Sequence, residues 1–385
     1  GVGGIPPHYL GGLVAKLGQP DEDGTMKHAA VCTDVAGWDT RIGMPMLNAE
    51  ERMITKGMHG EHLLQVRALY AGYKRPCIMV KRPDPTVPDQ YVIDFIQTEG
   101  QRMSGTVVTY TMNTVSNTVV LLYRSWEAEG KPNLTKWLES QANDRMSKMM
   151  VSGDDSVIFP ENPVEYSKSL EFINKVGLIR KDIPLWTPDQ VVKNYFELEM
   201  CSHQFRWVTL AGSRLYIAVK PEEEILGKGM FTVGQMKDQA IPAMAKAMAN
   251  YWLLIFPFQR DIRLAARAIR SCVNQYVVPA GKVKDPFFLD QPWMTTEDMF
   301  EVWRRIWIDD NPYREEKTLV RDWSEIPYLT QVQDRGLGSV IHTVDRKAWK
   351  NALPDLVRNI RRYWKQDDTP DELPQLRDAL RGFQL

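Results

Sequence analysis

Aspartates lie in two short segments where apolar runs of the sequence end. Asp34 ends the run 28–35, and Asp154 and Asp155 occupy a tight turn between two further apolar runs. A carboxylate at the end of a buried strand is costly unless water or a cation compensates its charge. Mg²⁺ prefers oxygen ligands, and two such ions about 3.5–4 Å apart can activate a hydroxyl group and stabilise a leaving pyrophosphate. Asp34 and Asp154 on adjacent strands would suit that chemistry.

A fourth carboxylate, Asp39, follows Asp34 by five positions, so strict strand alternation would send it to the opposite face. Gly37 lies between the two and allows the chain to turn, so Asp39 can return to the same pocket at another height. The alternative interpretation is that Asp154 and Asp155 are ordinary turn residues, which a lone Gly-Asp-Asp segment does not exclude.

Between these segments lies a polar stretch that begins with Ser104 and Gly105. Thr109 and Asn113 within it are four positions apart and would share one face of a helix, with Ser104 and Gly105 in a flexible loop before it. The stretch is rich in Val and Thr, whose helix propensity is poor, so a helix here would indicate a tertiary or functional demand. The alternative is that Thr109 and Asn113 are ordinary polar positions on a half-buried element.

The elements that must position these residues follow from hydrophobic periodicity and turn residues. The sequence mixes α and β patterns up to about residue 185 and is mainly α after it, so we place a boundary there. We predict strands over 28–35, 78–81 and 91–95, a hairpin over 147–159, and helices over 48–73, 237–256, 259–273 and 296–308, the last with capping and first-turn acids at 295–298.

Composition limits the class of protein. The 385 residues are 43% apolar, which is ample for a core, and this length predicts two or three domains. A net charge of −1 excludes a global basic field but leaves room for a local basic channel. The four cysteines contain no CxxC pair, so neither a disulfide framework nor an all-cysteine zinc site is expected, and a reducing compartment fits. No apolar run approaches the roughly 18 residues of a membrane span.

In their order along the chain, the three segments resemble motifs A, B and C of viral RNA-dependent RNA polymerases. Asp34 and Asp39 match motif A, 104–113 matches motif B, and 153–155 matches motif C. Reverse transcriptases usually place an aromatic residue before the two aspartates, so the glycine here favours RNA synthesis. Further segments make the chain similar to the flavivirus polymerases in particular: 36–41, 151–155, 180–184, 201–203, 293–299 and 325–329.

The resemblance implies an α+β right-hand polymerase, with an antiparallel palm sheet, helices around it, incomplete fingers and a mainly helical thumb. The resemblance implies that 1–27 form the end of the fingers and the entry into the palm, and that 28–185 form the palm, with a fingers insertion at about 45–100. The implied thumb is 186–345, with motif E at its start and a priming loop at about 280–292. A basic C-terminal segment follows at 346–385.

The resemblance also implies catalytic roles. Asp34 and Asp154 would ligate two Mg²⁺ (or Mn²⁺) ions, with Asp155 assisting. Lys181 of motif D would protonate the leaving pyrophosphate, and Arg180 is the second candidate. The alternative for Lys181 is an ordinary solvated lysine, because proton transfer requires a reach that the sequence does not show.

Further implied roles concern the nucleotide and the primer. Asp39, Ser104 and Asn113 would read the ribose 2′-hydroxyl, which distinguishes RNA from DNA, with Gly105 beside them and Thr109 supporting the network. Two other predicted contacts involve motif E and the priming loop. These are Ser202 and His203 against the primer or priming nucleotide, and Phe288 as a platform on which the initiating base stacks, unless Phe287 and Phe288 instead pack the loop onto the thumb.

The chain departs from the family at the thumb zinc site. The positions that align with its His and Cys ligands are Gln204, Arg206, Val219 and Leu337. Zinc requires thiolate, imidazole or carboxylate ligands. We therefore predict that no zinc is bound there.

Two basic features have open interpretations. Arginines recur at 3, 4, 3 spacing over 260–270 and could line an RNA path or form a solvated face paired with nearby acids. The segment 346–365 holds seven Lys or Arg residues, and the same two interpretations apply to it.

The implied function is template-directed nucleotidyl transfer from NTPs to an RNA 3′-hydroxyl, with initiation that needs no primer. The implied partners are template and product RNA, NTPs, the upstream fingers and a methyltransferase domain of the same polyprotein product, and the viral helicase and protease. The expected location is the host cytoplasm at membrane-associated replication complexes. The alternatives are a non-catalytic RNA-binding or scaffold fragment and a reverse transcriptase. Asp34 lies only 33 positions after Gly1, whereas the family carries a basic strand farther upstream, so we expect this fragment alone to polymerise poorly.

Overall fold

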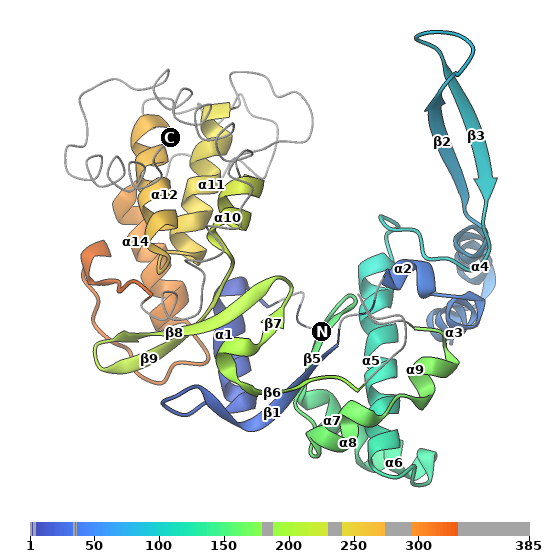
Figure 1. The fold of residues 1–385 in the computed structure, drawn as a ribbon, viewed down its shortest axis with the longest axis horizontal. Coiled ribbons are helices and arrows are strands. Elements are labelled where there is room, and N and C mark those ends of the chain that lie inside the picture. Colours follow the sequence, from blue (N-terminus) through green and yellow to red (C-terminus); the bar gives the residue numbers. More distant parts are fainter. Residues whose placement is uncertain are drawn as a thin grey trace. The chain divides into compact units, whose positions relative to one another are not determined.

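The computed structural model describes residues 2, 5–33, 35, 37–178, 188–229, 241–273 and 295–329. The chain divides into two compact units, the first formed by 1–4 and 17–194 and the second by 5–16 and 195–385 (Figure 1). The boundary predicted near residue 185 lies outside the described residues, as do the priming loop at 280–292 and the basic segment 346–385.

The first unit is built around a four-stranded antiparallel sheet in the order β4-β5-β1-β6. The predicted strand and the predicted hairpin are confirmed as its three neighbouring members. Thr33, the last residue of β1, pairs with Ser156 of β5, so the end of β1 lies beside the hairpin turn. The strands are β1 Thr25–Thr33, β4 Met149–Ser152, β5 Asp155–Ile158 and β6 Val191–Asn194.

Helix α5, Thr109–Ala128, carries the predicted motif B face and is confirmed as a helix. Its Leu121 is buried with Val31 of β1 and Ile158 of β5, so the helix packs on the sheet through apolar side chains. This burial offsets the weak helix propensity of its Val and Thr residues. The other helices of the unit outside the 44–74 region are α2 Trp38–Arg41, α6 Leu134–Ser140, α7 Ala142–Ser147, α8 Pro163–Lys168 and α9 Glu171–Lys175.

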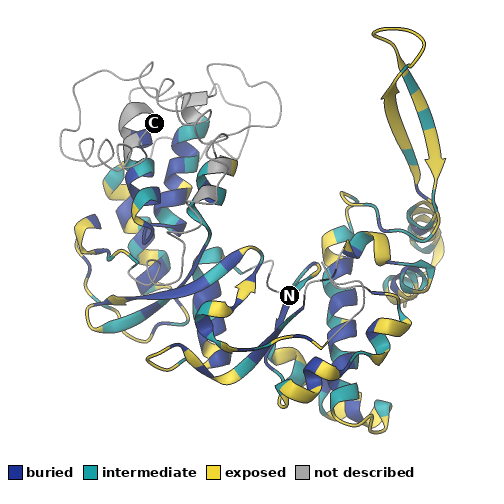
Figure 2. Ribbon diagram, in the orientation of Figure 1, coloured by how far each residue is buried: buried dark blue, intermediate teal, exposed yellow. Residues whose placement is uncertain are grey.

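The single helix predicted over 48–73 is wrong. The chain forms α3, Met44–Thr55, and α4, Gly60–Lys74, because Gly57 between them adopts the left-handed region at φ 83°. The two strands predicted over 78–81 and 91–95 are confirmed as an antiparallel hairpin, β2 Cys77–Pro83 and β3 Tyr91–Gln97. Most of its side chains are exposed, as Figure 2 shows.

Fully buried Arg124 of α5 joins four segments of the first unit. Its guanidinium donates to the Ser169 and Tyr166 carbonyls, to Thr33 Oγ1 at 3.2 Å and to Asp189 Oδ2 at 2.8 Å. A buried charge requires such compensation. Arg124 therefore fixes the end of β1 against α5.

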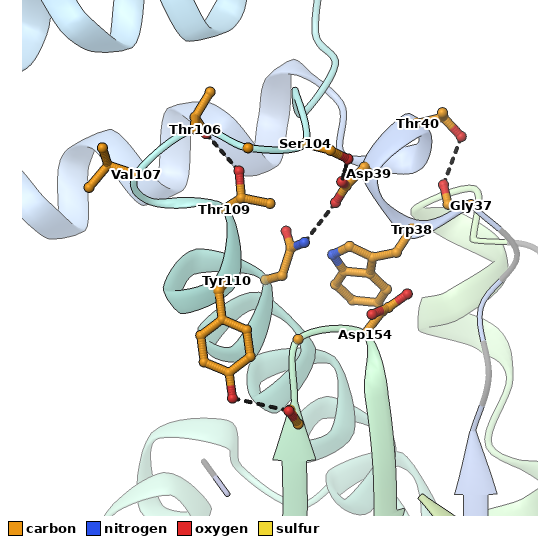
Figure 3. Close-up of a pocket in the computed structure, with 14 residues that line it drawn as sticks. Gly37, Trp38, Asp39, Thr40, Ser104, Thr106, Val107, Thr109, Tyr110 and Asp154 are labelled. Atoms are coloured by element: carbon orange, nitrogen blue, oxygen red, sulfur yellow. Dashed lines mark hydrogen bonds between the residues drawn. The ribbon is translucent and has the colours of Figure 1, made fainter. Parts of the chain in front are cut away.

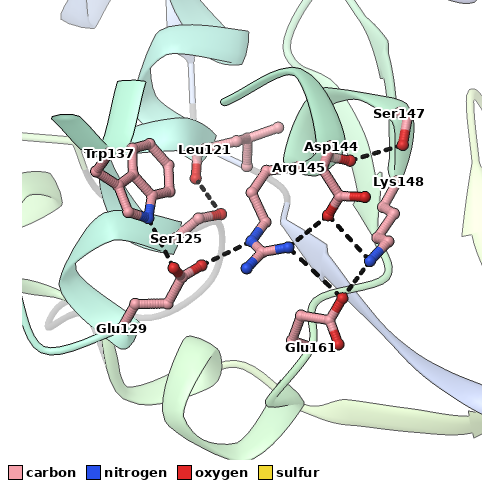
Figure 4. A network of polar contacts seen from close by, with 9 residues as sticks. All are labelled: Leu121, Ser125, Glu129, Trp137, Asp144, Arg145, Ser147, Lys148 and Glu161. Atoms are coloured by element: carbon pink, nitrogen blue, oxygen red, sulfur yellow. Dashed lines mark hydrogen bonds and ion pairs between the residues drawn. The ribbon is translucent and has the colours of Figure 1, made fainter. Parts of the chain in front are cut away.

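The C-terminal end of α5 is tied to the base of the β4–β5 hairpin by a polar network (Figure 4). Glu129 accepts from Trp137 Nε1 at 2.6 Å and from Arg145 Nε at 2.7 Å. Lys148, beside β4, pairs with Glu161, which follows β5, and this cation holds the pKa of the Glu161 carboxyl below its ordinary value. The network therefore joins the residues that flank the hairpin, at the end opposite its turn.

The second unit contains a three-stranded antiparallel sheet, β7-β8-β9. The sequence predicted a mainly helical thumb, which holds for the rest of the described unit, but it did not predict this sheet. Cys201 and Ser202 form a two-residue turn with φ 51° and 60°, and two positive φ values at non-glycine residues gave little turn signal in the sequence. The strands are β7 Glu199–Met200, β8 His203–Leu210 and β9 Ser213–Val219, and a short 3₁₀ turn, η1, precedes them at Tyr195–Glu197.

Helices of the second unit enclose an apolar core that includes fully buried Trp303 and Trp307. The capping predicted at 295–298 is confirmed, since Thr295 and Asp298 form a reciprocal capping box. The predicted helices at 237–256, 259–273 and 296–308 correspond to α11, α12 and α14, the last continuing as a π-helical turn. The bounds are α1 Pro7–Gly18, α10 Glu222–Gly229, α11 Ile241–Ile255, α12 Arg260–Val273, α14 Thr296–Arg304, η3 Arg305–Asp309 and η4 Trp323–Glu325.

The arginine stripe of α12 is neither a solvated face nor an open phosphate path along its whole length. Arg263 is buried, donates to the Ile326 carbonyl at 2.9 Å and stacks on Tyr328. Arg270 is also buried and donates to Asn250. Both therefore hold the interior of the second unit. Within the described residues, no helix is both long enough and apolar enough to span a membrane.

Candidate functional site: an aspartate cavity beside the β4–β5 turn

The turn that carries Asp154 is held by the side chains of α5. Ser152 pairs with Asp155, so Gly153 and Asp154 form a two-residue loop, and Gly153 supplies the positive φ of 63° that such loops require. The Gly153 N–H donates to Thr114 Oγ1 at 2.9 Å. The Asn117 amide donates to both loop carbonyls, at 3.2 Å and 2.9 Å.

A third residue of the same helix face, Tyr110, reaches the strand that leads into the turn. Its hydroxyl lies 3.0 Å from Ser152 Oγ. Positions 110, 114 and 117 of α5 lie on one face, as the helical spacing requires. Because α5 is itself packed on the sheet, it fixes the Gly153–Asp154 backbone and leaves the Asp154 side chain exposed.

Asp39 reaches the site because Gly37 turns the chain. Gly37 adopts φ 56° and ψ 51° and starts the short helix α2. The Asp39 carboxylate then accepts a hydrogen bond on each oxygen, Oδ2 from the Ser104 hydroxyl and Oδ1 from Asn113 Nδ2 at 2.7 Å. The predicted i, i+4 face of motif B is thus the face that meets Asp39.

Asp39 and Asp154 line one cavity of about 650 Å³. Figure 3 shows Asp39, Ser104 and Asp154 around this space, with Tyr110 beneath it. Thr109 supports the loop above, since its hydroxyl lies 2.7 Å from Thr106 Oγ1 and donates to the Met103 carbonyl at 2.9 Å. The fourteen lining residues are Gly37, Trp38, Asp39, Thr40, Ser104, Gly105, Thr106, Val107, Thr109, Tyr110, Asn113, Ser152, Gly153 and Asp154.

The sequence analysis missed Glu50 and Arg102, two buried residues that support the residues lining this cavity. Glu50 of α3 accepts from Arg102 and, at 2.7 Å, from Ser116 Oγ. Arg102 Nε donates to Asn113 Oδ1 at 3.0 Å, and the Arg102 N–H donates to the Asp39 carbonyl at 3.1 Å. Only the position of Arg102, two residues before Ser104 of the Ser-Gly pair, could have indicated it, and the position of Glu50 on a helix gives no such signal.

The oxygen donors of the site suit a hard divalent cation. Asp154 presents an exposed carboxylate to the cavity, and Asp155 follows it. Asp39 uses both carboxylate oxygens for hydrogen bonds, so it suits a ribose contact better than metal ligation. Among the residues that the structure describes, no three His, Cys, Asp or Glu side chains gather as a metal site. Asp34, the third predicted ligand, lies outside the described residues, directly after Thr33 in sequence.

Other predicted site residues fall in two groups. Lys181 and Phe288 lie outside the described residues, as does Arg180. In the second unit, Ser202 is exposed at the β7–β8 turn, whereas His203 is buried with Nδ1 2.9 Å from the Cys201 carbonyl. Burial, reinforced by Lys220, lowers the pKa of His203 to about 4, so the ring is neutral at physiological pH.

The aligned zinc positions are occupied by residues with other functions in the β8–β9 hairpin. Gln204 pairs with Val219 across the two strands. Arg206 is buried and donates to the carbonyls of Phe196 and Phe205. Leu337 lies outside the described residues. A cation such as Arg206 is itself unsuited to bind zinc.

The antiparallel sheet, with a carboxylate turn at one end and a helix that holds the turn, defines the palm of a right-hand nucleic-acid polymerase. Residues 1–191 match the family described as flavivirus RNA-directed RNA polymerase, fingers and palm domains. Residues 196–357 match the flavivirus RNA-directed RNA polymerase, thumb domain. The genome polyprotein of Kokobera virus is 37% identical over 377 residues, which is 94% of this chain and 11% of that polyprotein.

The chain therefore belongs to the flavivirus RNA-directed RNA polymerase family, and its two units correspond to the fingers and palm and to the thumb. Members of this family are enzymes that depend on divalent metal ions. The chain spans 11% of the length of the polyprotein that it matches.

Proposed function

We propose that the cavity between Asp39 and Asp154 binds an incoming NTP for template-directed addition to an RNA 3′-hydroxyl. The observation that carries the proposal is that Asp39 and Asp154 line one space while Ser104 and Asn113 hold both oxygens of Asp39. This places a hydrogen-bonding group for a sugar beside a carboxylate for a metal, which is the pairing that nucleotidyl transfer needs.

Asp39, Ser104 and Asn113 would select the ribose. An ionised carboxylate has more acceptor sites than the two that Ser104 and Asn113 use, so Asp39 can also accept from a 2′-hydroxyl. That hydroxyl can in turn accept from Ser104 or Asn113. A 2′-deoxynucleotide would leave these groups without that partner, and sites built to hydrogen-bond a hydroxyl reject analogues that lack it.

Asp154 and Asp34 would hold the divalent cations, with Asp155 assisting. When bound, two Mg²⁺ or Mn²⁺ ions would activate the 3′-hydroxyl and stabilise the leaving pyrophosphate. The chain's own contribution is to fix the backbone of the Gly153–Asp154 turn, Asp154 through Asn117 and Gly153 through Thr114, so that the carboxylate is oriented before substrate arrives.

Three further roles rest on the sequence. Lys181 would protonate the pyrophosphate, and Phe288 would stack on the first base to allow starts without a primer. Ser202, which is exposed, would contact the primer strand, whereas the burial of His203 corrects the predicted primer contact of that side chain. Deleting Asp285–Leu289 tests the role of Phe288. We expect loss of starts on a bare template while extension of an annealed primer continues, and equal loss of both would contradict it.

Nucleotide selection at single turnover tests the proposed function. The full-length viral polymerase that carries this sequence is given an annealed RNA primer–template and either one NTP or the matching 2′-dNTP. We expect wild type to prefer the NTP, and Asn113→Ala to lose most of that preference.

The other outcomes identify the alternatives. A preference for the 2′-dNTP would indicate a reverse transcriptase. No incorporation of either nucleotide, with RNA binding retained, would indicate a scaffold fragment. Unchanged NTP preference in Asn113→Ala would show that the cavity does not read the ribose.

A further inference from the structure

The orientation of the Asn113 amide decides what it can offer to Asp39. A side-chain amide has one accepting end and one donating end. Asp39 is an acceptor, so Asn113 must present Nδ2 to it, at 2.7 Å. The opposite end, Oδ1, faces Arg102 Nε at 3.0 Å. Arg102 carries only donors and never an acceptor. It is therefore compatible with the amide orientation that presents Oδ1 to it and incompatible with the flipped one, which would present Nδ2.

Arg102 is itself fixed by a second charge. Its guanidinium pairs with Glu50, and the two side chains are 2% and 4% exposed. Ser116 donates to the same Glu50 oxygen at 2.7 Å. A buried ion pair contributes little net stability when compared with apolar side chains of similar size. Such a pair is better explained by the geometry that it imposes.

Arg102 holds Asp39 by a second route. Its backbone N–H donates to the Asp39 carbonyl at 3.1 Å, while its side chain holds the amide that binds the Asp39 carboxylate. Ser104, which binds the other carboxylate oxygen, follows Arg102 by two residues. All polar contacts of Asp39 with the 102–113 segment therefore depend on where Arg102 sits.

We propose that Arg102 and Glu50 are positioning residues for ribose selection. Neither touches the cavity, since neither is among its lining residues. Glu50 orients Arg102, Arg102 orients the Asn113 amide, and Asn113 orients the Asp39 carboxylate toward the sugar. The inference rests on the proposed function of Asp39 and Asn113 as the ribose reader and adds the buried pair that sets its orientation.

The test compares NTP and 2′-dNTP incorporation in the full-length polymerase at single turnover. In Arg102→Met the amide is no longer restricted, so the NTP preference should fall by about tenfold, which is the effect of losing one charge-assisted hydrogen bond. Glu50→Gln keeps the shape but removes the charge and should lower the preference less. Arg102→Lys retains the pair but cannot contact Glu50 and Asn113 with the same fork, so its preference should also fall.

Arg124→Met is the matched control. Arg124 is equally buried and pairs with buried Asp189 in the same unit, but it makes no contact with Asp39, Asn113 or Ser104 in the described structure. Loss of fold stability alone would lower NTP and 2′-dNTP incorporation together and leave their ratio unchanged. We expect that behaviour from Arg124→Met and a changed ratio from Arg102→Met.

Adding Arg102→Met to Asn113→Ala should not change the ratio further, because the two substitutions act on one chain of contacts. If Asn113→Ala collapses the preference while Arg102→Met, Arg102→Lys and Glu50→Gln all retain it, the positioning proposal is overturned and the ribose reader stands. If Asn113→Ala retains the preference, the proposed function itself fails. If Arg102→Met or Arg102→Lys does not fold, the test of the positioning proposal rests on Glu50→Gln, which preserves side-chain volume.

Discussion

Asn117 donates one hydrogen bond to the Asp154 carbonyl at 2.9 Å, and Asn117 is itself 1% exposed. The same amide donates to the Gly153 carbonyl at 3.2 Å. One buried side chain of α5 thus fixes the backbone of both residues in the turn. The position of the Asp154 carboxylate is therefore determined by helix packing as well as by the hairpin.

Asn117→Ala should destabilise the protein by about 2 kcal/mol, because it removes the side-chain donor from two turn carbonyls. The midpoint of urea denaturation measures this loss. Thr118→Ala is the control, since among the described residues the Thr118 hydroxyl donates only to the Thr114 carbonyl of its own helix, and its effect should stay within about 0.5 kcal/mol. A wild-type midpoint for Asn117→Ala would show that the turn does not depend on this amide.

Gly37→Ala should weaken NTP binding as well as stability. Gly37 lies at φ 56°, and an added Cβ would also meet Thr40 Oγ1 at 3.0 Å. The left-handed conformation costs roughly 1–2 kcal/mol for alanine, and relaxation of the turn would move Asp39. Steady-state kinetics should therefore show a raised KM for NTP.

Gly57→Ala is the matched control for that substitution. Gly57 also has a positive φ, of 83°, but no described atom lies within 4 Å of an added Cβ. It stands between α3 and α4 and does not line the cavity. Its stability should fall by a similar amount with no change in KM. Equal KM values for NTP in the two variants would show that the Gly37 turn does not affect nucleotide binding.

Acidification should destabilise the protein through His203. Burial lowers its folded-state pKa to about 4, below the unfolded value of about 6.5. The unfolded chain binds more protons between these values, so stability falls as pH decreases through that window. One such group predicts a loss of about 1 kcal/mol between about pH 7.5 and about pH 5.5.

His203→Phe should reduce this pH dependence while keeping a ring beside Phe256. The measurement is the free energy of unfolding in urea at both pH values. His8, whose pKa burial also lowers to about 4, acts in the same direction and is present in both proteins. An identical pH dependence in wild type and His203→Phe would contradict a buried neutral imidazole.

Much of the first unit could be predicted from its sequence because the signals there are local. The Gly153 turn lies between two apolar runs, and the 109–113 spacing defines one helix face. The predicted hairpin is therefore confirmed as β4–β5, and the predicted helix as α5. The prediction that Gly37 lets Asp39 return also required only one glycine. Its structural outcome is the cavity shared by Asp39 and Asp154.

The parts that could not be predicted depend on contacts between distant residues. Glu50 and Arg102 are 52 positions apart, and nothing in either segment indicates that they meet. The β7–β8 turn uses positive φ at Cys201 and Ser202 rather than glycine, so a strand pair was missed. Arg263 belongs to a basic stripe in sequence but is buried, because the Ile326 carbonyl and Tyr328 provide partners.

The most direct test of the account is metal-dependent NTP incorporation by the full-length polymerase with Asp154→Asn. The asparagine preserves shape and removes the charge that a divalent cation needs. Asp144→Asn is the control, because Asp144 is a carboxylate of the same unit that pairs with Arg145 outside the cavity. We predict that Asp154→Asn loses on the order of a hundredfold or more of the rate while Asp144→Asn retains it. Equal incorporation by wild type and Asp154→Asn would contradict the assignment of this cavity as the polymerase site.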